Sequence, residues 1–165
     1  MMPEFLDEEF CDLIKPIKSL EEYQQLKKIK HHGITRYEHS LRVAFYSYVV
    51  TKALRLDYKE TTEAALLHDF FIDEVKEKNP IAKLRQHPQY AILNASKIIN
   101  LTEKQVDIIK THMFPVTFTP PKYLESWIVD IIDDIASIYE RGNNIRKHCK
   151  TAMIFLYVLL FINVK

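Results

Sequence analysis

Glycine is nearly absent from this chain, which has only two glycines in 165 residues. Tight turns in β-rich folds need residues that adopt positive φ angles, and glycine does so at least cost. Phosphate-binding loops of the glycine-rich kind need several glycines close together. The scarcity of glycine therefore excludes both and favours an all-α fold.

Cysteine is also scarce, and the net charge is close to zero. Cys11 and Cys149 are the two cysteines and form no recognisable disulfide framework, which favours a reducing compartment. The acidic start "MMPEFLDEEFCDL" lacks the basic and apolar regions of a signal peptide, so we expect a cytoplasmic protein. A net charge of +1 gives no electrostatic argument for a nucleic-acid partner or an anionic membrane.

No apolar run reaches the roughly 20 residues that span a bilayer as a helix. The stretch "TAMIFLYVLLFINV", residues 151–164, comes nearest. We predict a buried C-terminal helix over about 144–162. The alternatives are a tail that touches a membrane and a helix that a partner subunit covers. The length favours a single domain over 1–165, with the informative motifs in about 31–141.

Capping patterns and apolar periodicity predict a bundle of six to eight helices with no convincing strand. Ser19 with Glu22, and Thr102 with Gln105, have the spacing of capping boxes that open helices. Asp57 is a plausible N-cap for the helix that leads into "AALLHDFF".

Three further helices follow from the pattern. Residues 35–56 are apolar around most of a helical circumference, which indicates a central, buried helix. Pro88 suits a first helical position, with the segment around Pro80 as a connector. Residues 122–141 form the last of these, and the stripe expected to face the core is Leu124, Ile128, Ile131, Ile135 and Ile138.

Four of the seven histidines fall close to predicted helix ends, where the helices of a bundle can bring them together. They are His39, His68, His87 and His112, and His68 is followed directly by Asp69. Neighbouring positions on a helix diverge by about 100°. The adjacent pair can therefore share a metal only at the helix end, or if the carboxylate reaches between two ions. Imidazole with carboxylate suits Mn, Fe, Zn, Co or Ni better than Ca.

Five blocks in order resemble the HD-domain metal-dependent phosphohydrolase superfamily. The blocks are "YEHSLRVAFYSY", "AALLHDFF", "HPQYAILNASKII", "DIIKTHMFP" and "SWIVDIIDDIASIYE". Together they cover most of the chain, about residues 31–141. The resemblance implies an HD-domain-like helical bundle with a metal site at its heart.

The resemblance also implies the ligands of two divalent transition metal ions, whose identity stays open. The first ion would be held by His39, His68, Asp69 and a late aspartate, for which Asp133 is preferred and Asp134 is the alternative. Asp69 would bridge to a second ion, completed by His87 and His112. Many relatives with two metals have two consecutive histidines in the fourth block, whereas Met113 follows His112 here.

The implied activity is hydrolysis of a phosphate ester or anhydride, with a nucleotide as the expected substrate. A metal-bridging hydroxide would attack phosphorus, with His68 and Asp69 as the catalytic pair. Many relatives continue the His-Asp pair as "HDIGK", but this chain has "HDFFI" and lacks that lysine. Arg42 is the cation expected to hold a phosphate oxygen, and a salt bridge to a neighbouring acid is the alternative.

Two other functions stay open at this point. One is a non-catalytic, nucleotide-sensing regulatory module with the same fold. The other is a helical interaction domain anchored to a membrane or a partner through residues 151–164. A homo-oligomer is compatible with either.

Overall fold

The computed structural model describes residues 7–31, 34–72 and 79–142. This part of the chain contains seven α-helices, which confirms the all-α prediction. The α-helices are α1 (Glu8–Lys18), α2 (Glu21–Gln24), α3 (Arg36–Ala53), α4 (Tyr58–Leu67), α5 (Pro80–Ala95), α6 (Glu103–Thr111) and α7 (Leu124–Arg141). A 3-10 helix η1 (Gln25–Lys28) and two strands of two residues, β1 (Lys30–His31) and β2 (Ile34–Thr35), complete them.

The small sheet was not expected. β1 and β2 pair in an antiparallel manner just before α3. The helix predicted to open at Ser19 is short: α2 ends at Gln24, and η1 and β1 follow it.

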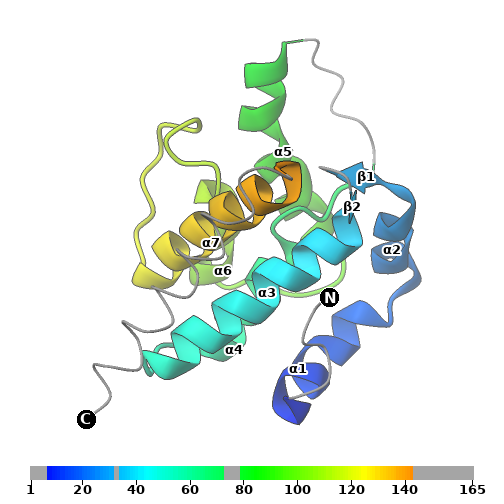
Figure 1. Cartoon of the computed structure of the whole chain (residues 1–165), viewed down its shortest axis with the longest axis vertical. Helices are drawn as coiled ribbons and strands as arrows, with labels where there is room; N and C mark the ends of the chain where they lie inside the picture. Colours follow the sequence, from blue (N-terminus) through cyan, green and yellow to red (C-terminus); the bar gives the residue numbers. More distant parts are fainter. Residues whose placement is uncertain (1–6, 32–33, 73–78, 143–165) are drawn as a thin grey trace.

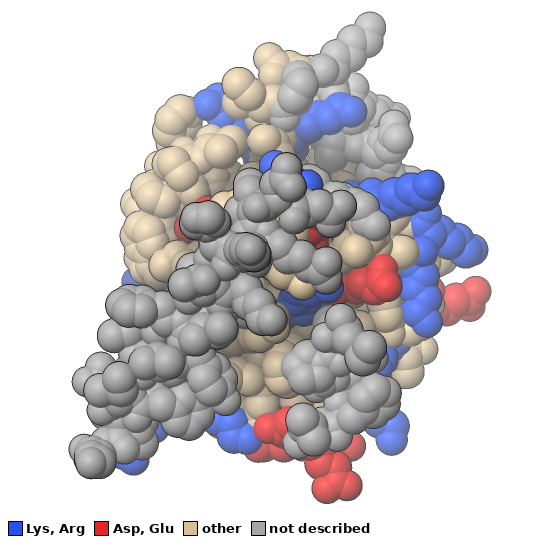
Figure 2. All heavy atoms as spheres, in the orientation of Figure 1, with Lys and Arg blue, Asp and Glu red and all other residues tan. Residues whose placement is uncertain are grey.

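Helix α3 lies at the centre of the bundle (Figure 1). It packs against α4 and α7, and α6 packs against both α4 and α7. Helix α5 contacts α6, and α1 contacts α4. Four helices thus surround one interior, to which α5 adds a further wall. On the face shown in Figure 2, basic and acidic side chains both occur, as the net charge of +1 leads one to expect.

Two predicted helix starts are confirmed by their hydrogen bonds. The Asp57 carboxylate accepts a hydrogen bond from the Glu60 backbone N–H at 3.2 Å and caps α4. At the start of α6, the Thr102 hydroxyl and the Gln105 side chain each accept from the other's backbone N–H, at 3.1 Å. These caps fix where α4 and α6 begin.

The predicted capping box at Ser19 is wrong. Ser19 is the C-terminal cap of α1, and its hydroxyl donates to the Pro16 carbonyl oxygen. Helix α1 was not predicted from the sequence. Its N-terminus is capped by Asp7, whose carboxylate accepts from the Phe10 N–H at 3.0 Å. Because the Ser19 hydroxyl bonds to a carbonyl at the end of α1, it does not cap the N-terminus of the next helix. Helix α2 accordingly begins without a side-chain cap.

The predicted start of a helix at Pro88 is also wrong. Helix α5 starts at Pro80, and Pro88 lies in its interior. The Asn79 side chain accepts from the Ile81 and Ala82 N–H groups, so Pro80 occupies the first helical position, where its missing N–H costs nothing. The cap at Asn79 outweighs the single backbone hydrogen bond that Pro88 removes.

The predicted inward stripe of the last helix is wrong for most of its members. Leu124 is 56% exposed, Ile131 50% and Ile138 45%, whereas Ile128 is buried. The buried face of α7 lies on another side and includes Val129, Ile132, Asp133 and Ala136. That face packs against α3 and α6, so it determines how the helix is oriented.

The predicted C-terminal helix over about 144–162 lies outside the described residues. Among the helices that the structure does describe, none is long and apolar enough to span a membrane.

Candidate metal centre

The fold brings together side chains from five helices or their ends. His39 lies in the first turn of α3, His68 caps the C-terminus of α4, and Asp69 follows it. His112 caps the C-terminus of α6, while Asp133 lies within α7. His87 lies inside α5 and not before a helix, because α5 starts earlier than predicted. All six side chains are buried, with residue exposures between 0 and 8%.

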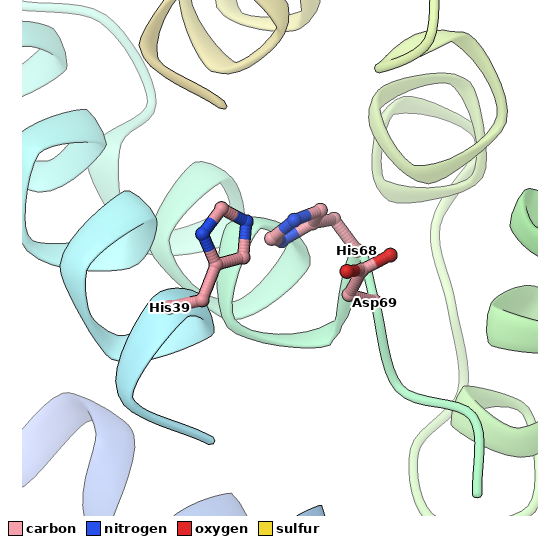
Figure 3. A group of neighbouring side chains, drawn as sticks. All are labelled: His39, His68 and Asp69. Carbon is pink, nitrogen blue, oxygen red and sulfur yellow. The ribbon is translucent and has the colours of Figure 1, made fainter. Parts of the chain in front are cut away.

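Three overlapping groups of these residues place one ligand atom each within 4.8 Å of one another. The groups are His39, His68 and Asp69; Asp69, His87 and His112; and His68, His112 and Asp133. His68, Asp69 and His112 each belong to two of these groups. Figure 3 shows the His39 ring beside the His68 ring, with the Asp69 carboxylate next to His68. The three groups therefore form one continuous cluster.

The two aspartates divide the histidines between them. Asp133 Oδ1 lies 2.8 Å from His39 Nε2 and 3.6 Å from His68 Nε2. Asp69 Oδ1 lies 3.3 Å from His87 Nε2 and 3.9 Å from His112 Nε2. One half of the cluster therefore centres on Asp133, and the other half centres on Asp69.

Backbone carbonyls fix the orientation of two of the histidines. His68 Nδ1 donates to the Ala65 carbonyl oxygen at 2.7 Å, and His112 Nδ1 donates to the Ile109 carbonyl oxygen at 2.7 Å. Each carbonyl lies three residues earlier, within the last turn of the same helix. In the neutral form of either ring the proton lies on Nδ1, and the lone pair of Nε2 is then free to bind a metal in the cluster.

The buried polar atoms of the cluster fit a bound cation. His68 Nε2 is buried and has no hydrogen-bond partner among the described residues, its nearest carboxylate oxygen being Asp133 Oδ1 at 3.6 Å. The Nε2 atoms of His87 and His112 lie 2.8 Å apart, so two ring nitrogens face each other. Buried polar atoms without partners are costly, and a positive ion among them would satisfy them. The mixed imidazole and carboxylate ligands suit a divalent transition metal.

The protonation states of His112 and Asp69 agree with metal binding, whereas His39 and His68 would each release a proton on binding a metal. Burial acts to lower the pKa of His39, but Asp133 and Glu140 outweigh it and raise this pKa to about 10, and Asp133 likewise raises the pKa of His68. Burial, together with the nearby His87 and His68, lowers the pKa of His112 to about 3, so this ring is neutral near pH 7. Burial acts to raise the pKa of Asp69, but His68, His87 and Arg36 outweigh it and hold this pKa well below its ordinary value. A neutral imidazole and an ionised carboxylate are the forms that bind metals.

The structure brings Asp133, and not Asp134, to the cluster. Asp133 is 6% exposed and lies beside His39 and His68, whereas Asp134 is exposed. The two carboxylates leave α7 about 100° apart. Because the face of α7 that carries Asp133 is the buried one, the ambiguity that the sequence left open has a geometric answer.

Arg42 forms the salt bridge that was the alternative to phosphate binding. Its guanidinium donates to Glu140 Oε1, and the side chain of Glu140 is only 1% exposed. The other carboxylate oxygen, Oε2, accepts from His39 Nδ1 at 2.9 Å. Glu140 thus connects Arg42 to a histidine of the cluster and fixes the orientation of the His39 ring. Its position, two helical turns after Asp133, is the sequence signal that could have revealed it.

A second arginine lies nearer to the cluster than Arg42. Arg36 is 9% exposed, its Nε atom lies 3.8 Å from Asp69 Oδ2, and it donates to the Phe71 carbonyl oxygen. The centre of its guanidinium lies 3.6 Å from the centroid of the Phe71 ring. Arg36 was not predicted from the sequence, although it precedes His39 by one helical turn. Phe71, which precedes the position of the missing lysine, lies under this guanidinium.

The link through Glu140 gives a first testable prediction. We expect Glu140→Ala to lower the free energy of unfolding of the metal-free protein by roughly 3 kcal/mol, because it leaves two partly or fully buried cations without their carboxylate. Urea unfolding measures this loss. Arg42→Ala combined with Glu140→Ala should cost less than the sum of the single changes. Glu22→Ala, on an exposed part of α2, is the control and should change stability little. Additive costs for the pair would contradict the assignment.

The comparisons with known proteins agree with this geometry. A family model described as "HD domain" matches residues 36–138, which include all six residues of the cluster. No curated protein and no solved structure matches the chain. The match covers more than half of the chain and confirms the resemblance drawn from the five sequence blocks. This chain belongs to the HD domain family.

Proposed function

We propose that this protein is a metal-dependent phosphohydrolase that cleaves a phosphate ester or anhydride of a nucleotide. The HD domain family is a superfamily of metal-dependent phosphohydrolases, which supports the reaction class. The observation that carries the proposal is the buried cluster of four histidines and two aspartates, with Asp69 in two of its ligand groups. A purely structural core would not leave the buried His68 Nε2 without a hydrogen bond.

The cluster has enough ligands for two ions. In the proposed assignment, His39, His68, Asp69 and Asp133 hold the first, and Asp69, His87 and His112 hold the second. Bound divalent ions supply Lewis acidity, which activates water near neutral pH and offsets charge on phosphoryl oxygens. The second set has one protein ligand fewer, in keeping with the single histidine in the fourth sequence block.

The chain's own residues position the reacting groups. Asp69, held ionised by its neighbours, accepts a hydrogen bond from the attacking water. Arg36 supplies the positive charge that relatives obtain from a lysine, since Ile72 stands at the lysine position. The fork of guanidinium donors suits the oxygens of a phosphate group. Its position over the Phe71 ring keeps it oriented before substrate binds.

The first test is hydrolysis itself. Purified protein supplied with Mn, Fe, Co, Ni or Zn should hydrolyse at least one member of a panel of nucleotides and other phosphate esters. Asp69→Asn should abolish turnover and metal binding, because it removes the carboxylate that both ligand groups share. Asp134→Asn is the matched control on the exposed side of α7 and should keep both.

Two outcomes of this experiment would contradict the proposal. Protein that takes up none of these metals would rule out the metal centre. Tight nucleotide binding without turnover under any metal would instead support the non-catalytic sensing module. The replacement of the usual lysine by Ile72 is the feature that favours this second function.

The number of ions is tested by changing the ligands of one half. His87→Asn should lower the measured stoichiometry from two ions to one per chain, since only the proposed second set loses a ligand. Metal analysis after dialysis gives this ratio. Gln86→Ala, at the exposed neighbouring position of α5, should leave it unchanged. A stoichiometry of one in the unchanged protein would refute the second ion.

The proposed role of Arg36 separates substrate binding from metal binding. Arg36→Lys keeps the charge but loses the paired donors, so kcat/KM should fall by roughly 10²-fold while the metal content stays the same. Steady-state kinetics and metal analysis on the same preparation measure the two effects. Arg55→Lys, at an exposed position, serves as the control. An unchanged kcat/KM in Arg36→Lys would exclude Arg36 as the phosphate ligand.

A further inference from the structure

The outer face of α7 carries a row of exposed apolar side chains. Leu124 is 56% exposed, Trp127 37%, Ile131 50% and Ile138 45%. Their spacings of three, four and seven residues place them on one stripe of the helix. The stripe lies on a different side of α7 from Asp133, whose face is buried against α3 and α6. We call it the α7 stripe.

A stripe of this length is unusual for a surface that faces water. Single exposed apolar side chains are common, but a continuous row of large ones indicates a surface that packs against something. Leu124, Ile131 and Ile138 also belong to the stripe that the sequence predicts to face the core. The apolar pattern therefore predicts that this side of α7 is buried, although within the described residues it is exposed.

The chain itself carries a segment suited to cover this stripe. Residues 152–162, "AMIFLYVLLFI", are apolar without interruption, and they follow α7 in the sequence after a short polar stretch, 143–150. As a helix, residues 151–164 would be about 20 Å long, and the α7 stripe from Leu124 to Ile138 has about the same length. The segment is too short to cross a bilayer as a helix.

The connection is long enough for the segment to reverse direction. Residues 143–150 make eight residues, including Arg146, Lys147 and Lys150, and such polar links join antiparallel helices in bundles. A segment that follows its target directly in the chain also has a high effective concentration beside it. These features favour the chain's own segment over a separate partner.

We propose that residues 151–164 pack as a helix along the α7 stripe and cover its apolar side chains. Helix α7 would then be held from both sides, by α3 and α6 on the face of Asp133 and by this segment on the other. The inference does not depend on the proposed enzymatic function.

Trp127, the only tryptophan of the chain, lies on the α7 stripe, so its fluorescence shows whether the stripe is covered. In the intact 165-residue chain we expect blue-shifted Trp127 emission that acrylamide quenches weakly. Ile138→Asp lies about 16 Å further along α7, so its effect on Trp127 would arise through release of the segment. This variant should shift the emission to the red and increase quenching. Leu93→Asp, at a 62% exposed position on α5, is the control and should change neither.

A second variant of the intact chain leaves the described fold untouched. Leu156→Asp combined with Leu160→Asp places charges within the segment and should produce the same red shift while circular dichroism shows that α-helices 1 to 7 persist. Three results would overturn the proposal. They are Trp127 quenching that neither variant changes, shielding that disappears on dilution as for a second copy of the chain, and shielding that requires phospholipid vesicles.

Discussion

The convergence of two carboxylates and four imidazoles in one buried space is the constraint on which this structure depends. Burying Asp69 and Asp133 would be prohibitively costly if positive or metal-bound groups did not surround them. Asp69 lies among His68, His87 and Arg36, which hold its pKa well below the ordinary value. Every helix that supplies one of these groups must therefore meet the others at the same place. Helices α3, α4, α5, α6 and α7 pack so that these side chains lie next to one another.

Helix ends make the convergence possible. His68 and His112 each close a helix, and each uses a carbonyl of the last turn to direct its Nε2 atom inward. His68 and Asp69 can both face the cluster because α4 ends at this point. Beyond the helix, the Asp69 side chain no longer has to point about 100° away from that of His68. Glu140 performs for His39 what a carbonyl performs for the other two, and Arg42 holds Glu140 in place. The cluster thus has a fixed outer layer of hydrogen bonds.

Two departures from the common family pattern become consistent once Arg36 is considered. The position of the usual lysine holds Ile72, and the position before it holds a bulky phenylalanine. In the folded protein Phe71 lies beneath the guanidinium of Arg36 and against His87. A small residue there would leave Arg36 without support. In the proposed function, Arg36 on this aromatic ring takes the place of the lysine, and the six residues of the cluster are unaffected by the exchange.

The sequence by itself determined the helical class, the caps of α4 and α6, and the residues that form the cluster, because glycine content, capping pairs and ordered histidine blocks are local signals. It misplaced the starts of α2 and α5, since Ser19 and Pro88 are each compatible with two local roles and hydrogen bonds elsewhere decide between them. The tertiary structure places the preferred Asp133, and not Asp134, beside the histidines, and it alone revealed Glu140 and Arg36. These distinctions depend on which face of α7 is buried and on contacts between residues up to about a hundred positions apart, which periodicity along one helix does not encode.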